Sequence, residues 1–128
     1  MTPRIAIACS QALTGALLLI GIWLALPARW WPVDVAGTLL GAGALLVTLL
    51  LALRQRLGPA VARIVLWAEL VLGSLAVTLL AASIAQLAGS YGPVGSGGAL
   101  LMGTIGALIA PYLIGLPVLQ LFWLRRLR

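Results

Sequence analysis

The chain has 128 residues, of which 63% are hydrophobic and 8% are charged, and its formal net charge is +6. A soluble domain is about half apolar and a quarter charged, so a mean hydropathy of +1.20 predicts folding in lipid. The arginines lie scattered at the ends of apolar runs, which argues against the dense basic face of a nucleic-acid-binding protein. With no histidine and one cysteine, Cys9, the chain lacks the residues of zinc–histidine sites and Ser–His pairs. We therefore expect no cofactor, no metal ion and no enzymatic activity.

Two apolar runs fill the first half of the chain, and each has about the 20 residues that a helix needs to cross a hydrocarbon core. The first covers residues 5–26 and ends at Pro27. It is longer than the apolar core of a signal peptide, so we expect the mature chain to retain it. The second run covers residues 35–53.

Two further runs fill the second half of the chain. Gly58-Pro59 breaks the chain before the third run, at residues 61–88. A glycine-rich stretch, residues 89–98, is predicted as a loop before the fourth run, at residues 99–124. The sequence therefore predicts an all-α polytopic membrane protein, in which the whole chain forms a single domain, a four-transmembrane-helix bundle.

The arginines also predict the orientation, because loops that face the cytoplasm are richer in Lys and Arg. The connection at residues 54–63 and the C-terminal tail carry three arginines each, whereas the loop at residues 27–34 has one arginine opposed by Asp34. We expect a protein of the cell inner (plasma) membrane with both termini in the cytoplasm. The arginines expected to set this orientation and to contact lipid headgroups are Arg54, Arg56, Arg63, Arg125, Arg126 and Arg128.

Small residues mark the faces on which membrane helices pack, because they let two backbones approach closely. The fourth run repeats such residues at every fourth position, and the second run carries one pair at the same spacing. The predicted packing positions are Gly37, Gly41, Gly95, Ala99, Gly103, Ala107 and Gly115. The ridge on the fourth run could seat a neighbouring helix of the same bundle or a helix of another subunit.

Two prolines, Pro111 and Pro117, are predicted to kink the fourth helix. Each lacks the N–H that would bond to a carbonyl one turn earlier. Such a kink is either static, with neighbouring groups satisfying the freed backbone, or a place where a transport site forms. The sequence leaves both interpretations open.

Glu69 is the best candidate for chemistry, because a carboxylate inside a membrane is rare and costly. Counting along each helix from the nearest arginine places Gln11, Thr48, Glu69 and Gln120 at the same depth, roughly 8–10 Å inward. This polar layer is either hydrogen-bonding glue between helices, worth about 0.6 kcal/mol per contact, or a proton or cation site served by Glu69.

Two functional hypotheses follow. A non-enzymatic subunit or assembly partner of a larger membrane complex fits the ridge on the fourth run and the poverty of reactive groups. A small oligomeric transporter or channel, with Glu69 as the proton- or cation-coupling carboxylate, fits the polar layer. On either hypothesis the expected partners are the lipid bilayer and other transmembrane subunits, of the same or another chain, and no nucleic acid.

Overall fold

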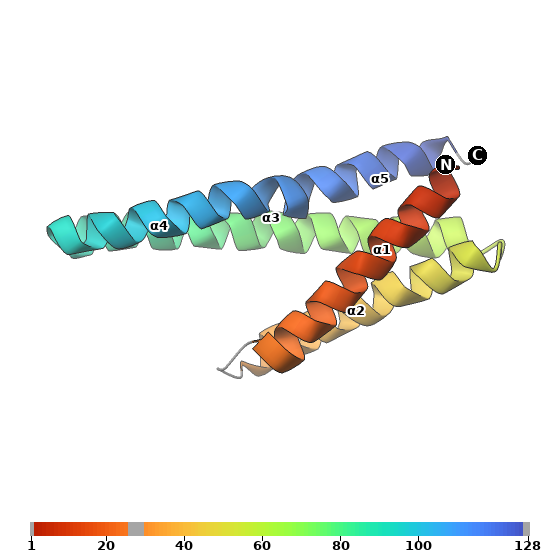
Figure 1. Cartoon of the computed structure of the whole chain (residues 1–128), viewed down its shortest axis with the longest axis horizontal. Helices are drawn as coiled ribbons and strands as arrows, with labels where there is room; N and C mark the ends of the chain where they lie inside the picture. The colour runs from red at the N-terminus through yellow and green to blue at the C-terminus, as the bar shows by residue number, and fades with distance from the viewer. Residues whose placement is uncertain (1, 26–29, 127–128) are drawn as a thin grey trace. The chain divides into compact units, whose positions relative to one another are not determined.

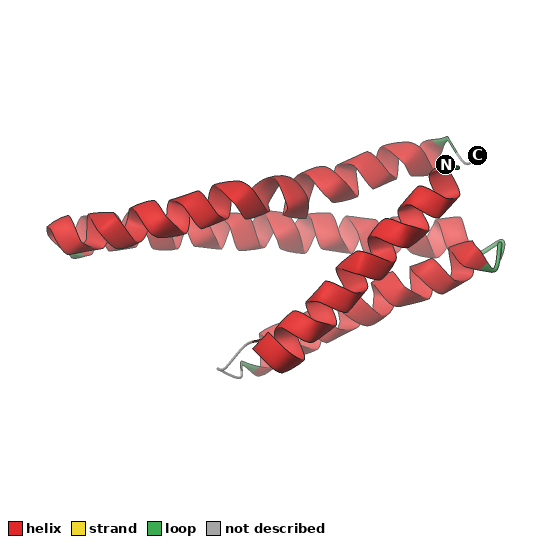
Figure 2. Cartoon of the chain, in the orientation of Figure 1, coloured by secondary structure: helices red, strands yellow, loops and turns green. Residues whose placement is uncertain are grey.

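The computed structural model describes residues 2–25 and 30–126, and every regular element in these ranges is a helix (Figure 2). The α-helices are α1 (Pro3–Ile20), α2 (Trp31–Ala52), α3 (Gly58–Ser90), α4 (Gly92–Ala110) and α5 (Leu116–Arg125). The π-helical turn η1 (Gly21–Ala25) extends α1, and a second, η2 (Pro111–Gly115), joins α4 to α5. The all-α prediction is confirmed. Residue 26 of the first predicted run and Arg128 lie outside the described residues.

Four stretches of the described chain are long and apolar enough to cross a membrane: Pro3–Leu24, Trp31–Ala52, Gly58–Ser90 and Gly92–Arg125. The predicted number is confirmed, but the lengths fall into two classes. The first two stretches have 22 residues each, and the last two have 33 and 34. At about 1.5 Å per residue these are helices of roughly 33 Å and 50 Å, against a hydrocarbon core of roughly 30 Å.

Part of the extra length of the fourth stretch comes from the glycine-rich segment, of which residues 92–98 are helical. Because α3 continues to Ser90 and α4 begins at Gly92, the loop predicted at residues 89–98 is wrong. The turn between the two helices is tight because Gly92 adopts a φ of 56°, a conformation that glycine reaches without steric cost. Pro93 then lies in the first turn of α4, where its fixed φ suits a helix and its missing N–H is not needed. These two residues override the weak helix propensity of the glycines that follow.

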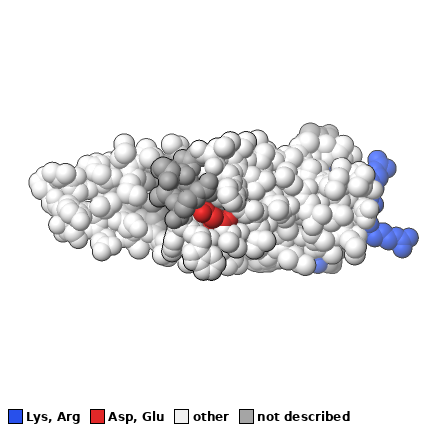
Figure 3. Space-filling model, turned by 90° about the horizontal axis from the view of Figure 1, so that it is seen from below, with Lys and Arg blue, Asp and Glu red and all other residues white. Residues whose placement is uncertain are grey.

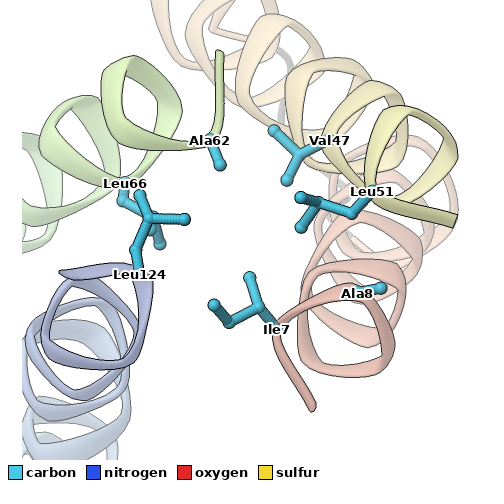
Figure 4. Close-up of a cluster of buried hydrophobic side chains, with 7 residues drawn as sticks. All are labelled: Ile7, Ala8, Val47, Leu51, Ala62, Leu66 and Leu124. Carbon is cyan, nitrogen blue, oxygen red and sulfur yellow. The ribbon is translucent and has the colours of Figure 1, made fainter. Parts of the chain in front are cut away.

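The chain divides into two compact units. Unit 1 contains residues 1–68 and 120–128, and unit 2 contains residues 69–119. In unit 1, α1 and α2 run antiparallel (Figure 1), and they share a buried apolar cluster with the start of α3 and the end of α5. The members of this cluster are Ile7, Ala8, Val47, Leu51, Ala62, Leu66 and Leu124 (Figure 4). We call this region, where α1 and α3 begin and α2 and α5 end, the four-helix end of unit 1. The single four-span domain stays a prediction.

The turn from α2 to α3 carries an arginine in an unusual backbone conformation. The N–H of Arg54 donates to the Leu51 carbonyl at 3.2 Å, and the N–H of Gln55 donates to the Leu50 carbonyl at 3.0 Å. These are the two bonds of a Schellman cap, in which glycine usually occupies the left-handed position. Here Arg54 occupies it, with a φ of 54°. A residue with a side chain in this region costs roughly 1 kcal/mol or more. The backbone conformation of Arg54 is therefore locally unfavourable.

Unit 2 is a hairpin in which α4 and η2 run back along α3 (Figure 1). The helices approach closely at glycines. A Cβ on Gly95 would overlap the Leu87 carbonyl oxygen, and a Cβ on Gly106 would lie 2.8 Å from Leu80 Cδ2. Close backbone approach at small residues therefore holds this hairpin together, as expected for helices in an apolar medium.

Candidate functional site

A polar junction inside unit 1 joins the first helix of the chain to the last. The side-chain amide Nε2 of Gln11 donates to Oε1 of Gln120 at 2.7 Å, and Nε2 of Gln120 donates to the Ser10 hydroxyl oxygen at 2.7 Å. Both glutamines are 0% exposed, and a buried amide needs such partners because an unsatisfied one is costly. The structure thus brings together Gln11 and Gln120, two residues that the sequence placed at one depth, and it adds Ser10, which the sequence analysis missed.

Thr48 connects α2 to the same junction. Its hydroxyl group bonds to the Ala8 carbonyl of α1 at 3.1 Å and to the Ala44 carbonyl of its own helix at 3.0 Å. Ala8 lies one turn before Gln11 on α1, so the two sets of bonds are neighbours along that helix. Side chains of the junction therefore link α1, α2 and α5.

Glu69, the fourth residue of the predicted layer, is the first residue of unit 2. Its side chain is 9% exposed, and it is one of the two carboxylates in the sequence. The junction of Gln11, Gln120 and Thr48 is a feature of unit 1. The placement of Glu69 in the same layer therefore stays a prediction.

One turn beyond Glu69, Gly73 makes room for a backbone carbonyl. The Leu113 oxygen of η2 would lie 2.7 Å from a Cβ on Gly73, so a side chain does not fit there without a backbone shift. Leu113 belongs to the π-helical turn η2. Glu69 and Gly73 share one face of α3 because they are four residues apart. The face of α3 that carries Glu69 therefore meets the backbone of η2 at Leu113.

The two prolines that are predicted to kink the fourth helix lie at the beginning of the π-helical turn η2 and just after its end. Pro111 is the first residue of η2, and its missing N–H releases the carbonyl of Ala107, which a change to π-helical bonding accommodates. Pro117 is the second residue of α5, which runs on to Arg125. The helix has one irregular segment here, η2, which begins at Pro111 and ends two residues before Pro117. The two kinks stay predictions.

The predicted ridge of small residues on α4 and η2 is not the contact face of the hairpin along its whole length. Gly95 and Ala99 are buried. Further along, Ala107 is exposed, and a Cβ on Gly103 or Gly115 would meet no described atom within 4 Å beyond its own helix. The reason is geometric, because a step of four residues turns about 40° more than a full helical turn. The ridge thus winds away from α3.

Glycines also form the contact between α1 and α2. A Cβ on Gly15 would lie 2.8 Å from the Gly41 carbonyl oxygen, and a Cβ on Gly41 would lie 3.3 Å from the Gly15 oxygen. Ile22 fills the space beside Gly37, where a Cβ would overlap its Cδ1. Gly37 and Gly41 are among the predicted packing positions, and Gly15 is not. Its position four residues after Gln11, on the same helix face, is the signal that could have found it.

The described arginines belong to unit 1 and lie at its four-helix end: Arg4, Arg54, Arg56, Arg63, Arg125 and Arg126. The basic side chains visible in Figure 3 lie together at one end of the face shown. Arg126 also stacks on the Phe122 ring, with its Cζ 4.8 Å from the ring centroid, a cation–π contact. Arg128 falls outside the described residues.

Comparison of the chain with protein-family models, curated proteins and solved structures finds no match. Within the described ranges, no group of three or more His, Cys, Asp or Glu side chains is placed to hold a metal ion. A function must therefore be proposed from the residues and contacts described above.

Proposed function

We propose that this protein is a non-enzymatic polytopic protein of the cell inner membrane that acts as a subunit or assembly partner of a larger membrane complex. In this proposal the four long helices cross the membrane, and the four-helix end lies in the cytoplasm with both termini, because arginines favour that side. Long helices with exposed apolar side chains support insertion, since such surface is unfavourable in water. Examples are Leu24, Val94, Leu100 and Leu108, which are 80%, 85%, 73% and 76% exposed.

The proposal of a protein partner rests on an open strip of small residues on α4 and η2, which consists of Gly103, Ala107 and Gly115. In an apolar stretch of 18 residues within the fourth candidate span, 6% of the residues are buried inside the described structure. The corresponding share is 28% in each of the first two spans. A smooth face of small residues permits close van der Waals packing of another helix, and this packing drives helix association in lipid. Because the described part of this chain leaves the strip open, we propose a transmembrane helix of another chain as its occupant.

Site-specific photo-crosslinking in native membranes tests this partner. A benzophenone-bearing residue is placed at Gly103 or Gly115, on the strip, and at Gly106 as a control. Gly106 is at nearly the same depth as Gly103 but faces Leu80 inside the hairpin. We expect a protein adduct of defined mass from the strip positions and none from Gly106. A second copy of the chain and a different protein are told apart by the mass of the adduct.

A bulky substitution provides an independent measurement. Gly103→Leu should reduce the mass of the complex in native mass spectrometry to that of the chain alone, because the new side chain fills the strip. The isolated chain should keep its helix content, since its own described atoms leave space at this position. Lipid adducts alone at Gly103 and Gly115, or an unchanged complex with Gly103→Leu, would contradict the proposed partner.

A second candidate function is supported by the surroundings of Glu69. Its side chain is 9% exposed, and the Leu113 carbonyl oxygen lies against Gly73, one turn further along α3. Carboxylate and carbonyl oxygens are ligands that suit a cation, and a carboxylate inside a membrane can also carry a proton. On this basis the protein would be a small oligomeric transporter or channel, with Glu69 as its coupling residue.

Proteoliposomes test the second candidate. Proton flux is followed with a pH-sensitive dye, and the original chain is compared with Glu69→Gln and with a control, Gln55→Ala, in the exposed α2–α3 turn. The transporter hypothesis predicts flux above that of empty vesicles, its loss in Glu69→Gln, and its retention in the control. If the original chain conducts no more than empty vesicles, or if Glu69→Gln conducts equally well, the hypothesis fails.

A further inference from the structure

A pocket of about 480 Å³ lies between α3 and α5 at the four-helix end of unit 1. Two arginines line it, Arg63 from α3 and Arg125 from α5. The rest of the lining is Trp67, Leu121 and Leu124. Tryptophan favours the headgroup level of a bilayer, since its ring is apolar and its N–H is polar. The pocket thus combines cationic groups with an apolar wall.

A second pocket, of about 450 Å³, lies between α1 and α2 at the same end. Its charged lining residues, among those described, are Arg4 and Arg54. The hydroxyls of Thr2 and Thr48 add polar groups, and most of the remaining wall is apolar. Both volumes fall within the range of small-molecule pockets, about 300–1,000 Å³.

The two pockets have the same arrangement of arginines. Each takes one arginine from the beginning of a helix, Arg4 or Arg63, and one from the end of the antiparallel helix beside it, Arg54 or Arg125. Two like charges around one pocket repel each other. Arg54 also holds a left-handed backbone conformation, with a φ of 54°, where glycine would be free of cost. A bound anion would offset both the repulsion between the two arginines and the backbone cost at Arg54.

We propose that each pocket binds the phosphate group of an anionic glycerophospholipid. The guanidinium groups match the phosphate oxygens in charge and in geometry, and the apolar wall contacts the glycerol and the upper acyl chain. Free phosphate would leave that wall exposed, so a lipid fits better. This inference rests on the membrane insertion proposed above but not on a protein partner. The sites would anchor the cytoplasmic end of each helical hairpin to anionic lipid.

Native mass spectrometry of the full, delipidated chain in a neutral detergent tests the two sites. The chain is titrated with phosphatidylglycerol, and separate samples receive phosphatidylcholine or inorganic phosphate. We expect two tightly bound phosphatidylglycerol molecules per chain. We also expect that phosphatidylcholine does not occupy the sites and that inorganic phosphate does not displace the lipid.

Paired substitutions assign the sites. Arg63→Gln with Arg125→Gln should weaken one site roughly thirtyfold, the effect of two lost arginine contacts with an anionic lipid. Arg4→Gln with Arg54→Gln should weaken the other. Arg56→Gln with Arg126→Gln is the matched control, because it removes the same charge from residues that line neither pocket. Circular dichroism verifies that each variant keeps its helices, and Arg63→Lys with Arg125→Lys keeps the charge if the first pair does not fold.

Several results would overturn the inference. Equal weakening by the control pair would mean that net charge alone attracts the lipid. Equal binding of phosphatidylcholine would mean that the arginines do not recognise the anionic headgroup, and displacement by inorganic phosphate would assign the pockets to a free anion. The chain is assayed alone, so the absence of a partner for the strip on α4 does not affect the outcome.

Discussion

Unit 1 and unit 2 both pack through glycines, and in unit 1 polar side chains also link separate helices. In unit 1 side-chain hydrogen bonds join separate helices, as between Gln11 and Gln120 and between Thr48 and Ala8. In unit 2 hydroxyl groups bond to carbonyls of their own helix, three or four residues earlier. These hydroxyls belong to Thr78, Ser83, Ser96 and Thr104. In unit 1 polar links between helices therefore act together with the close approach of Gly15 and Gly41, and in unit 2 close approach occurs at Gly73 and Gly106.

The interhelical polar bonds of unit 1 suggest that the two units differ in how selectively their helices choose neighbours. A buried polar bond between two helices has few alternative partners, so it fixes which helices are neighbours and in which register. Packing at small residues is less selective, because other small-residue faces offer the same fit. We infer that unit 1 is specified within the chain and that the outer face of unit 2 is the surface available to another subunit.

The largest expected effect is on the contact between α1 and α2. Gly15→Ile should lower the free energy of unfolding by about 3 kcal/mol or more, because its Cβ meets the Gly41 carbonyl oxygen, which cannot move away without shifting α2. Reversible unfolding in mixed micelles measures this change. The control is Gly21→Ile, where a Cβ would have no atom of the described chain within 4 Å. Equal loss in both variants would contradict the close approach at Gly15.

The corresponding contact in unit 2 should be less costly to break. Gly73→Ala places a Cβ against the Leu113 carbonyl and should cost about 2 kcal/mol. Gly103→Ala adds the same methyl group on the open strip and should be neutral or stabilising by up to about 1 kcal/mol, because alanine favours a helix over glycine. The same micelle assay compares the pair. If the two variants are equally stable, the hairpin does not pack through Gly73.

Removal of the polar junction should have an intermediate effect on unit 1. Gln120→Leu leaves the buried amide of Gln11 without this partner and should cost about 1.5 kcal/mol. A double-mutant cycle with Gln11→Leu isolates the pair. We expect the double variant to lose less stability than the sum of the single variants. Strictly additive losses would show that the two glutamines do not interact.

The smallest effect compares one hydroxyl from each unit. Thr48→Val removes the bond to Ala8 of another helix and should cost about 0.6 kcal/mol. Thr104→Val removes only a bond to the Leu100 carbonyl of its own helix and should change stability by less than about 0.3 kcal/mol. Thermal unfolding in identical micelles measures both variants. A larger loss for Thr104→Val would reverse the proposed difference between the units.

Much of the fold follows from helix length, because a helix of about 20 apolar residues is the form in which an apolar chain satisfies its backbone. Counting from the arginines also placed Gln11 and Gln120 at one depth, and they bond to each other. The glycine content of residues 89–98 favours a loop, whereas Pro93 marks the helix start that the structure has there.

Contacts that depend on the partner helix were harder to predict. Gly15 is one small residue among many in α1, and its role appears only with Gly41 opposite. Gly73 likewise depends on Leu113, a residue with no distinctive chemistry, whose carbonyl oxygen lies against it. Periodicity within one helix indicates a candidate face, but the rotation of the neighbouring helix decides which part of that face is used.

Thiol labelling in intact cells tests the membrane topology on which these proposals depend. Cysteine is introduced at Gln55, in the α2–α3 turn, or at Ser96, near the start of α4, with Cys9→Ser as the background; both positions are exposed. A membrane-impermeant maleimide should label Ser96→Cys from outside, and it should label Gln55→Cys only after the membrane is permeabilised. Labelling of both positions from the same side of the membrane would contradict the account.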